Sequence, residues 1–116
     1  EIDEPAMMAQ VVTRLQSVIA LPLQIDTSDV KAMEQAMRIY NGKPMVNSVN
    51  GKKEVMEAVF PLVRKYGGVV VALCLDENGI PETAAGRLAV AKRSTRRRPP
   101  TVLRRRISWW MPCAWL

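Results

Sequence analysis

The sequence predicts an α/β fold in which helices alternate with the strands of a parallel sheet. Segments with the apolar spacing of a half-buried helix alternate along the chain with short apolar runs of strand length. The run at residues 68–75, GVVVALCL, is continuous and rich in β-branched residues, as in strands buried on both faces. Helices between consecutive strands imply right-handed crossovers. Because three strands close no barrel and the 116-residue chain begins at Glu1, we expect a piece of a larger α/β protein.

The first helix is predicted over residues 3–20. Asp3 can cap its start, and Pro5 stands where proline is favoured in a first helical turn. The apolar residues that follow have the spacing of one buried helix face: Met8, Val11, Val12, Leu15, Val18 and Ile19. Pro22 ends this pattern, and the apolar run LPLQI at 21–25 is predicted to be the first strand.

The alternation of helix and strand then repeats. Ser28 and Asp29 can cap a second helix, which Asn41-Gly42 would end. Its predicted apolar stripe consists of Val30, Met33, Met37 and Tyr40. Residues 44–49 (PMVNSV) form the second predicted strand, and Asn50-Gly51 turns the chain toward a third helix.

A third helix is predicted where apolar residues again recur at helical spacing: Val55, Met56, Val59, Phe60 and Val63. Gly67-Gly68 ends this helix, and the strand at 68–75 follows it. Residues 76–79 (DENG) form a loop, and we expect Pro81-Glu82 to begin a fourth helix. The chain to this point holds about three strand–helix units.

The basic charge of the chain is confined to its last residues. The net charge of +6 equals the six arginines of residues 94–116, because residues 1–93 hold 11 basic and 11 acidic side chains. A basic domain suggests nucleic-acid binding, but the part with a readable fold is neutral. The chain has no histidine, which excludes His-based metal sites and Ser-His-Asp triads.

The cysteines and the hydropathy narrow the class of protein further. Cys74 and Cys113 lie too far apart for a CxxC metal site and are too few for a disulfide framework. They favour a reduced, cytoplasmic protein. No apolar run has the length of a membrane span, and no signal peptide is recognisable. We therefore expect no membrane partner and no metal ligand, and we assign no catalytic residue.

The functional signal lies at the carboxyl ends of the first two predicted strands, where parallel sheets bind ligands. Asp26 follows the first strand, and Asn47 ends the apolar part of the second. A carboxylate accepts two N–H bonds from the edge of a heterocycle, and an amide adds a donor and an acceptor. The pair suits a pterin or guanine-type ring. The structural alternative makes Asp26 a helix cap and Asn47 a turn residue.

The stretch LPLQIDTSDVKAMEQAMRIYNGKPMVNSVNG resembles the methyltetrahydrofolate-binding domain of the cobalamin-dependent methionine synthase family. The opening EIDEPAMM and the continuation from KKEVMEAVF to RLAVAK extend the resemblance over residues 1–93. It implies part of a (β/α)8 TIM barrel of the pterin-binding, dihydropteroate-synthase-like type. Asp26 and Asn47 would hydrogen-bond the pterin ring. Asn50 and Asp76 lie in loops on the same face, without an assigned role.

The resemblance also implies an activity. The family binds 5-methyltetrahydrofolate and passes its methyl group to cob(I)alamin in methionine biosynthesis, as a 5-methyltetrahydrofolate–homocysteine methyltransferase. Cobalamin, zinc and homocysteine would be held by other domains of the parent enzyme, and we expect this piece alone to be inactive. Two other pterin-barrel enzymes stay open, a dihydropteroate synthase and a methyltetrahydrofolate–corrinoid methyltransferase. Ser48 favours the methyltransferases, since dihydropteroate synthases usually have Asn-Asp at 47–48.

Residues 94–116 depart from the family pattern, with two runs of three arginines, Pro99-Pro100 and all three tryptophans. Trp and Met have single codons, so the DNA under Trp109-Trp110-Met111 is fixed, and its neighbouring frame encodes Val-Asp. A buried strand with an Asp is what the family pattern expects here. We therefore hypothesise a frameshift near Arg93–Ser94. The other interpretations are an RNA-binding segment, a segment on an anionic membrane surface and a disordered basic tail.

Overall fold

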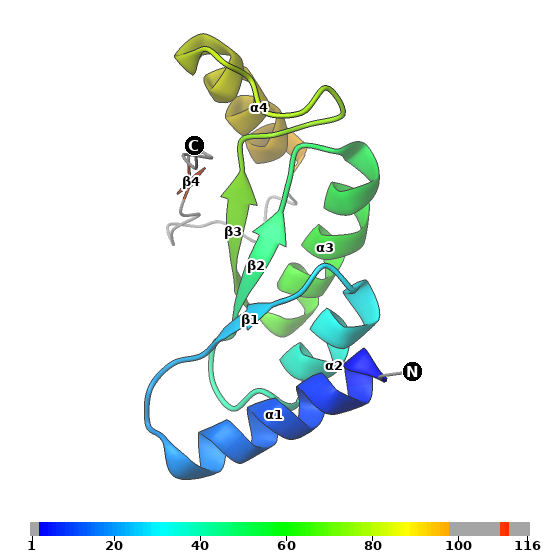
Figure 1. Ribbon diagram of the computed structural model, residues 1–116, viewed down its shortest axis with the longest axis vertical. Coiled ribbons are helices and arrows are strands. Elements are labelled where there is room, and N and C mark those ends of the chain that lie inside the picture. Colours follow the sequence, from blue (N-terminus) through cyan, green and yellow to red (C-terminus); the bar gives the residue numbers. More distant parts are fainter. Residues whose placement is uncertain (1–2, 98–109, 112–116) are drawn as a thin grey trace.

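A computed structural model describes residues 3–97, 110 and 111 of the chain. Its helices and strands alternate in the order α1 (Glu4–Val18), β1 (Gln24–Asp26), α2 (Val30–Ile39), β2 (Met45–Val49), α3 (Lys53–Tyr66), β3 (Val69–Leu73), α4 (Ala84–Arg97) and β4 (Trp110–Met111). The strands form one sheet in chain order, and all three neighbouring pairs are parallel. Figure 1 shows α2 and α3 on the same side of the sheet, with α1 beside α2. The predicted α/β fold is confirmed.

Local signals set several helix ends as predicted. The Asp3 carboxylate accepts a hydrogen bond from the Ala6 amide at 3.1 Å, and Pro5 lies in the first turn of α1. Asp29 caps α2. Gly67 ends α3 with φ of 69°, a left-handed conformation that favours glycine. These ends follow from the sequence because a cap needs only residues within one helical turn.

The first strand and the fourth helix both begin later than predicted. β1 comprises Gln24–Asp26 only, because Pro22 has no amide hydrogen and the Leu23 amide donates to the Tyr40 hydroxyl at 2.9 Å instead of to a strand. α4 begins at Ala84, not at Pro81-Glu82, because the Thr83 hydroxyl accepts from the Gly86 amide at 3.1 Å. Thr83 thus acts as the cap that starts this helix.

The sheet gains a short strand from the arginine-rich segment. Ala72 and Leu73 of β3 pair with Trp110 and Met111 of β4. This two-residue strand follows α4 and is parallel to β3, so it occupies the position of the next strand in a strand–helix repeat. α4 itself runs through the predicted boundary between residues 93 and 94.

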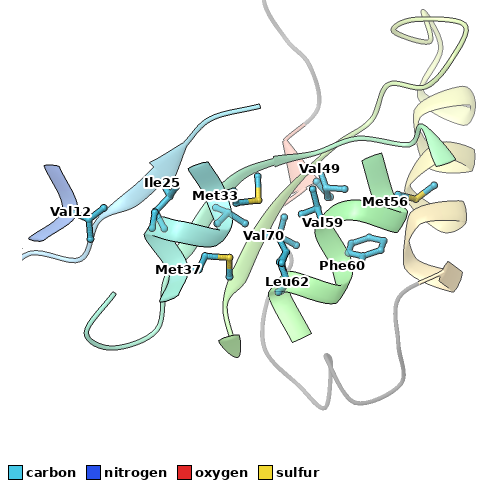
Figure 2. Packing of buried hydrophobic residues seen from close by; sticks show 14 residues of the cluster. Val12, Ile25, Met33, Met37, Val49, Met56, Val59, Phe60, Leu62 and Val70 are labelled. Carbon is cyan, nitrogen blue, oxygen red and sulfur yellow. The ribbon is translucent and has the colours of Figure 1, made fainter. Parts of the chain in front are cut away.

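The hydrophobic core lies between the sheet and the helices α2 and α3 (Figure 2). Ile25 of β1, Val46 of β2 and Val70 of β3 contribute from the strands, each less than 7% exposed. The helices contribute most of the remaining side chains: Met33, Ala36, Met37, Met56, Val59, Phe60, Leu62 and Val63. The predicted apolar stripes of α2 and α3 are therefore buried, except that Val30 is 37% exposed and that Tyr40 and Val55 are only partly buried.

The predicted buried face of α1 is mostly exposed, which corrects the sequence-based expectation. Val12 is 3% exposed and Met8 packs partly against the core. Val11, Leu15 and Val18 are 44%, 39% and 75% exposed. α1 contacts α2, and within the described residues no element covers its remaining apolar side. Helical spacing predicts which residues share a face, but burial also needs a partner for that face.

Candidate functional site

The two side chains predicted to form a site are brought together. Asp26 is the last residue of β1, and Asn47 is its register partner in β2. The Asn47 Nδ2 atom donates to Asp26 Oδ2 at 3.3 Å. β2 continues past Asn47 to Val49, with a register irregularity between these two residues and a cis peptide bond between Asn47 and Ser48. Asn47 therefore stands inside the strand and not at its end.

The capping and turn interpretations of these two residues are wrong. Asp29 is the residue that caps α2, since one of its carboxylate oxygens accepts from the Lys31 amide at 2.7 Å and the Ala32 amide at 3.0 Å. Asn47 lies in a strand, and Asn50 is the residue that stabilises the following turn. Apart from the bond to Asn47, the Asp26 carboxylate has no hydrogen-bond partner among the described residues, so it retains acceptor capacity.

A pocket of about 390 Å³ opens beside this pair. Pockets of about 300–1,000 Å³ with one apolar wall and a few polar groups are typical of small-molecule sites. Its polar lining residues are Asp26, Thr27, Ser28, Asn47, Ser48, Asn50 and Glu54. Its apolar lining residues come from α2 and α3 and form what we call the apolar wall: Val30, Met33, Val55, Ala58 and Val59. An aromatic heterocycle could stack its face on the apolar wall and present its edge to the polar residues.

Thr27 shapes the site but has no free hydrogen to offer a ligand. Its backbone amide donates to the Asn47 carbonyl at 3.1 Å, which ties the end of β1 to β2. Its hydroxyl donates to Glu4 at the start of α1 and accepts from the Asp29 amide at 3.0 Å. The side chain is buried, with 8% exposure. Thr27 thus fixes the backbone on which Asp26 stands.

Asn50 and Asp76, which the sequence placed on the same face, have different positions. Asn50 lines the pocket together with Asp26 and Asn47. Asp76 lines a separate hollow of about 460 Å³ and accepts a hydrogen bond from Arg93 at 2.9 Å. Sequence reasoning missed Glu54 and the apolar wall as pocket residues. The helical spacing of the apolar residues on α2 and α3 indicated only that they are buried, because residues of a core and residues of a pocket wall follow the same apolar pattern.

Arg93 of α4 connects two loops at the carboxyl end of the sheet. Its Nη2 atom donates to the Gly51 carbonyl and to Asp76, both at 2.9 Å, and to Glu77 at 3.3 Å. The other oxygen of the Glu77 carboxylate accepts from the Lys53 amide at 3.0 Å. Backbone amides of Glu77 and Lys53, and then the Arg93 charge, lower the pKa of Glu77. The cluster holds the loop after β2 against the loop after β3.

We searched the described part of the chain for metal-ligating clusters and for helices that could span a membrane. Residues 3–97, 110 and 111 contain no cluster of three or more metal-ligating side chains. Over the same residues, no helix has both the length and the apolar character needed to cross a bilayer.

Comparison with known proteins identifies the class to which this fold and site belong. Residues 1–99 match the pterin binding enzyme family. Because the match covers most of the chain, the chain is a member of that family. The parallel strands β1, β2 and β3, which alternate with helices, form part of the (β/α)8 barrel expected from the resemblance.

The chain is also similar to a segment of two methionine synthases. The methionine synthase of Mycobacterium leprae is 30% identical over 93 residues, which are 76% of this chain and 8% of that protein. The methionine synthase of Mycobacterium tuberculosis is 29% identical over 96 residues, which are 78% of this chain and 8% of that protein. The chain therefore spans less than a tenth of the length of these relatives.

Proposed function

We propose that this chain is a pterin-binding segment of a folate-dependent methyltransferase of the methionine synthase type, a cytoplasmic enzyme. It binds 5-methyltetrahydrofolate, and the methyl group passes to cob(I)alamin on another domain of the parent enzyme. The observation that carries the proposal is the Asp26–Asn47 pair, held in register at the mouth of a pocket of heterocycle size. Membership in the pterin binding enzyme family supports the substrate class.

The role of the chain's own residues is to bind and orient the pterin. The Asp26 carboxylate accepts from the adjacent ring N–H and exocyclic amino group, which lie side by side on the pterin edge. Asn47 donates one amide hydrogen to Asp26 and keeps its carbonyl oxygen and second amide hydrogen for the ligand. The apolar side chains of α2 and α3 exclude water from the ring face. Orientation of this kind lowers the entropic part of a transfer barrier.

Cobalamin supplies the methyl-accepting metal chemistry, and this chain does not fit it as a resident group. The chain has no histidine that could coordinate a metal ion, and the described residues hold no cluster of metal-ligating side chains. We place cobalamin, and the zinc and homocysteine of the second half-reaction, on other domains of the parent enzyme. We therefore propose that this segment alone does not catalyse methyl transfer.

Substitution of the pair tests the proposal. Titration of 5-methyltetrahydrofolate into the labelled 116-residue chain by NMR detects even millimolar binding. Asp26→Asn keeps the shape but removes the charged acceptor, so we expect about tenfold weaker binding or more, and Asn47→Ala should weaken binding by a similar factor. Asn41→Ala is the control, because Asn41 lies beyond the opposite end of the sheet, in the loop before β2. Equal affinities for all three variants would contradict the proposal.

Two other pterin-barrel activities remain as alternatives for the parent enzyme: dihydropteroate synthesis and methyl transfer to a separate corrinoid protein. The methionine synthase relatives favour the first proposal over both. The DNA upstream of this segment separates them. A preceding homocysteine-binding zinc domain supports methionine synthase, and its absence supports one of the alternatives.

We also propose that residues 1–93 are the barrel segment and that residues 94–116 are read out of frame. The fixed codons of Trp109-Trp110-Met111 and the concentration of arginine after position 93 support this. Sequencing of the locus decides it: a neighbouring frame that encodes Val-Asp-Ala within a continuing barrel is the expected result. The competing function is RNA binding by this segment. Salt-sensitive RNA retention on filters that disappears when residues 94–116 are removed would favour that function.

A further inference from the structure

We propose that Asn50 determines specificity at the pterin site by selecting rings with an oxo group over rings with an amino group at position 4. The inference rests on the proposed pterin site and names a residue to which neither the sequence nor the family match gives a role. Asn50 lines the pocket with Asp26 and Asn47 and is half-buried.

The hydrogen-bonding direction of the Asn50 amide is fixed. Its Oδ1 atom accepts a hydrogen bond from the Lys52 amide at 3.0 Å. This bond sets which end of the side-chain amide is oxygen and which is nitrogen. Among the described residues nothing accepts a hydrogen bond from the Nδ2 atom. Asn50 therefore brings to the pocket a donor that cannot turn into an acceptor without breaking the turn.

The backbone next to Asn50 is also held on both sides. The Gly51 amide donates to the Leu75 carbonyl at 2.7 Å, and the Gly51 carbonyl accepts from Arg93 at 2.9 Å. A Cβ atom at Gly51 would lie 2.6 Å from a Val90 methyl group and 2.8 Å from the Leu75 carbonyl oxygen. The chain here is packed so closely against β3 and α4 that Asn50 has little freedom to reorient.

The other polar groups of the pocket do not offer a donor that is both fixed in direction and wholly without a partner. The Thr27 hydroxyl hydrogen is directed to Glu4, and one Asn47 amide hydrogen is directed to Asp26. Ser28 and Ser48 carry hydroxyls that rotate to donate or accept, so either ring substituent would satisfy them. Asn50 is the pocket amide whose nitrogen end has no partner within the described residues.

The pterin edge supplies the matching pattern. A 4-oxo ring presents two neighbouring donors, the amino group and the ring N–H, followed by the oxo acceptor. If Asp26 accepts from the donors, the next position along the edge needs a donor, which Asn50 Nδ2 provides. A 4-amino ring places a donor opposite that amide and has no hydrogen on the ring nitrogen that faces Asp26. Both mismatches leave polar groups unpaired, and together they weaken its binding by about tenfold or more.

Asn50→Asp tests the proposal, because aspartate keeps the acceptor for the Lys52 amide and replaces the donor by an acceptor. The probes are pterin, with a 4-oxo group, and 2,4-diaminopteridine, titrated into the 116-residue chain by NMR. We expect the wild type to prefer pterin by about tenfold or more, and Asn50→Asp to reduce this preference severalfold, while the part that comes from Asp26 remains. Asn78→Asp adds the same charge in the loop after β3, outside the pocket, and should keep the preference.

Asn50→Ser is the second variant, because its shorter hydroxyl can cap the turn but extends less far into the pocket. It should also reduce the preference severalfold, which keeps the test valid if Asn50→Asp disturbs the turn. A wild-type preference retained in both variants would overturn the role of Asn50 while leaving the pterin site standing. Failure of both probes to bind the wild type would overturn the pterin site itself and the inference with it.

Discussion

At the end of β1, the side chains of Asp26, Thr27 and Asp29 have three distinct roles, and this division explains why Asp26 is available to a ligand. Asp29 caps α2, and Thr27 links β1 to Glu4 of α1. Because these two residues satisfy the local backbone and packing needs, Asp26 is left with acceptor capacity beside the pocket. A carboxylate kept out of the capping role, next to an amide from the neighbouring strand, is suited to recognise a heterocycle edge.

At Glu77 we predict a pH-dependent loop contact. Its pKa is lowered in the folded chain by its own backbone amide, the Lys53 amide and Arg93. A lowered carboxyl pKa means that the contact stabilises the fold at neutral pH and is lost as the pH falls through that pKa. The Lys53 amide signal should therefore shift in an acid NMR titration. This acid-induced shift of the Lys53 amide should vanish in Glu77→Gln and persist in Glu82→Gln. A shift that survives in Glu77→Gln would refute the contact.

At the scale of elements, α2 anchors the core, and we predict a large local cost for its truncation. Met33 is 1% exposed, whereas Met7 of α1 is 46% exposed. Met33→Ala should lower the stability of the neighbouring strands by about 2 kcal/mol or more, because the deleted atoms leave a cavity. Met7→Ala is the matched control and should cost far less. Hydrogen exchange of the Ile25 and Val46 amides measures both, and similar protection in the two variants would contradict this packing.

The sequence predicts those elements whose signals are local, and the misses have a common cause. Asp3, Asp29 and Gly67 end or start helices through bonds within a turn, so residue type and position suffice. The exposed side of α1 and the late start of β1 depend on what lies beside them. Arg93 reaches Gly51 across 42 positions of the chain, a contact that no spacing rule encodes.

The candidate site was predicted in the same uneven way. Asp26 and Asn47 could be named because strand ends in a parallel sheet converge. Asn50 could be placed on the same face but given no role. Its proposed role depends on the fixed orientation of its side-chain amide and on the close packing around Gly51, which the sequence does not show. The apolar wall could not be separated from the core in the sequence, because both follow the helical period.

For the whole molecule, the exposed apolar surface predicts thermal unfolding that is not cooperative. Large apolar side chains are exposed along α1 and its following loop: Met7, Val11, Leu15, Val18, Ile19 and Leu21. In the described sheet, β1 pairs with a strand on one side only. Such surfaces normally have partners in a closed fold. We expect a broad, non-cooperative melting curve and strong binding of a hydrophobic dye. One sharp transition without dye binding would show that the chain forms a self-sufficient fold.

The central claim, a pterin site where β1 and β2 meet, is tested most directly by mapping the ligand on the unmodified chain. Titration of 5-methyltetrahydrofolate into ¹⁵N-labelled protein reports every backbone amide and the side-chain amides of Asn47 and Asn50 in one spectrum. We expect saturable shifts confined to the residues that line the 390 Å³ pocket, with both side-chain amides among the largest. Saturable shifts centred on α4 instead, or no shifts at millimolar ligand, would contradict it.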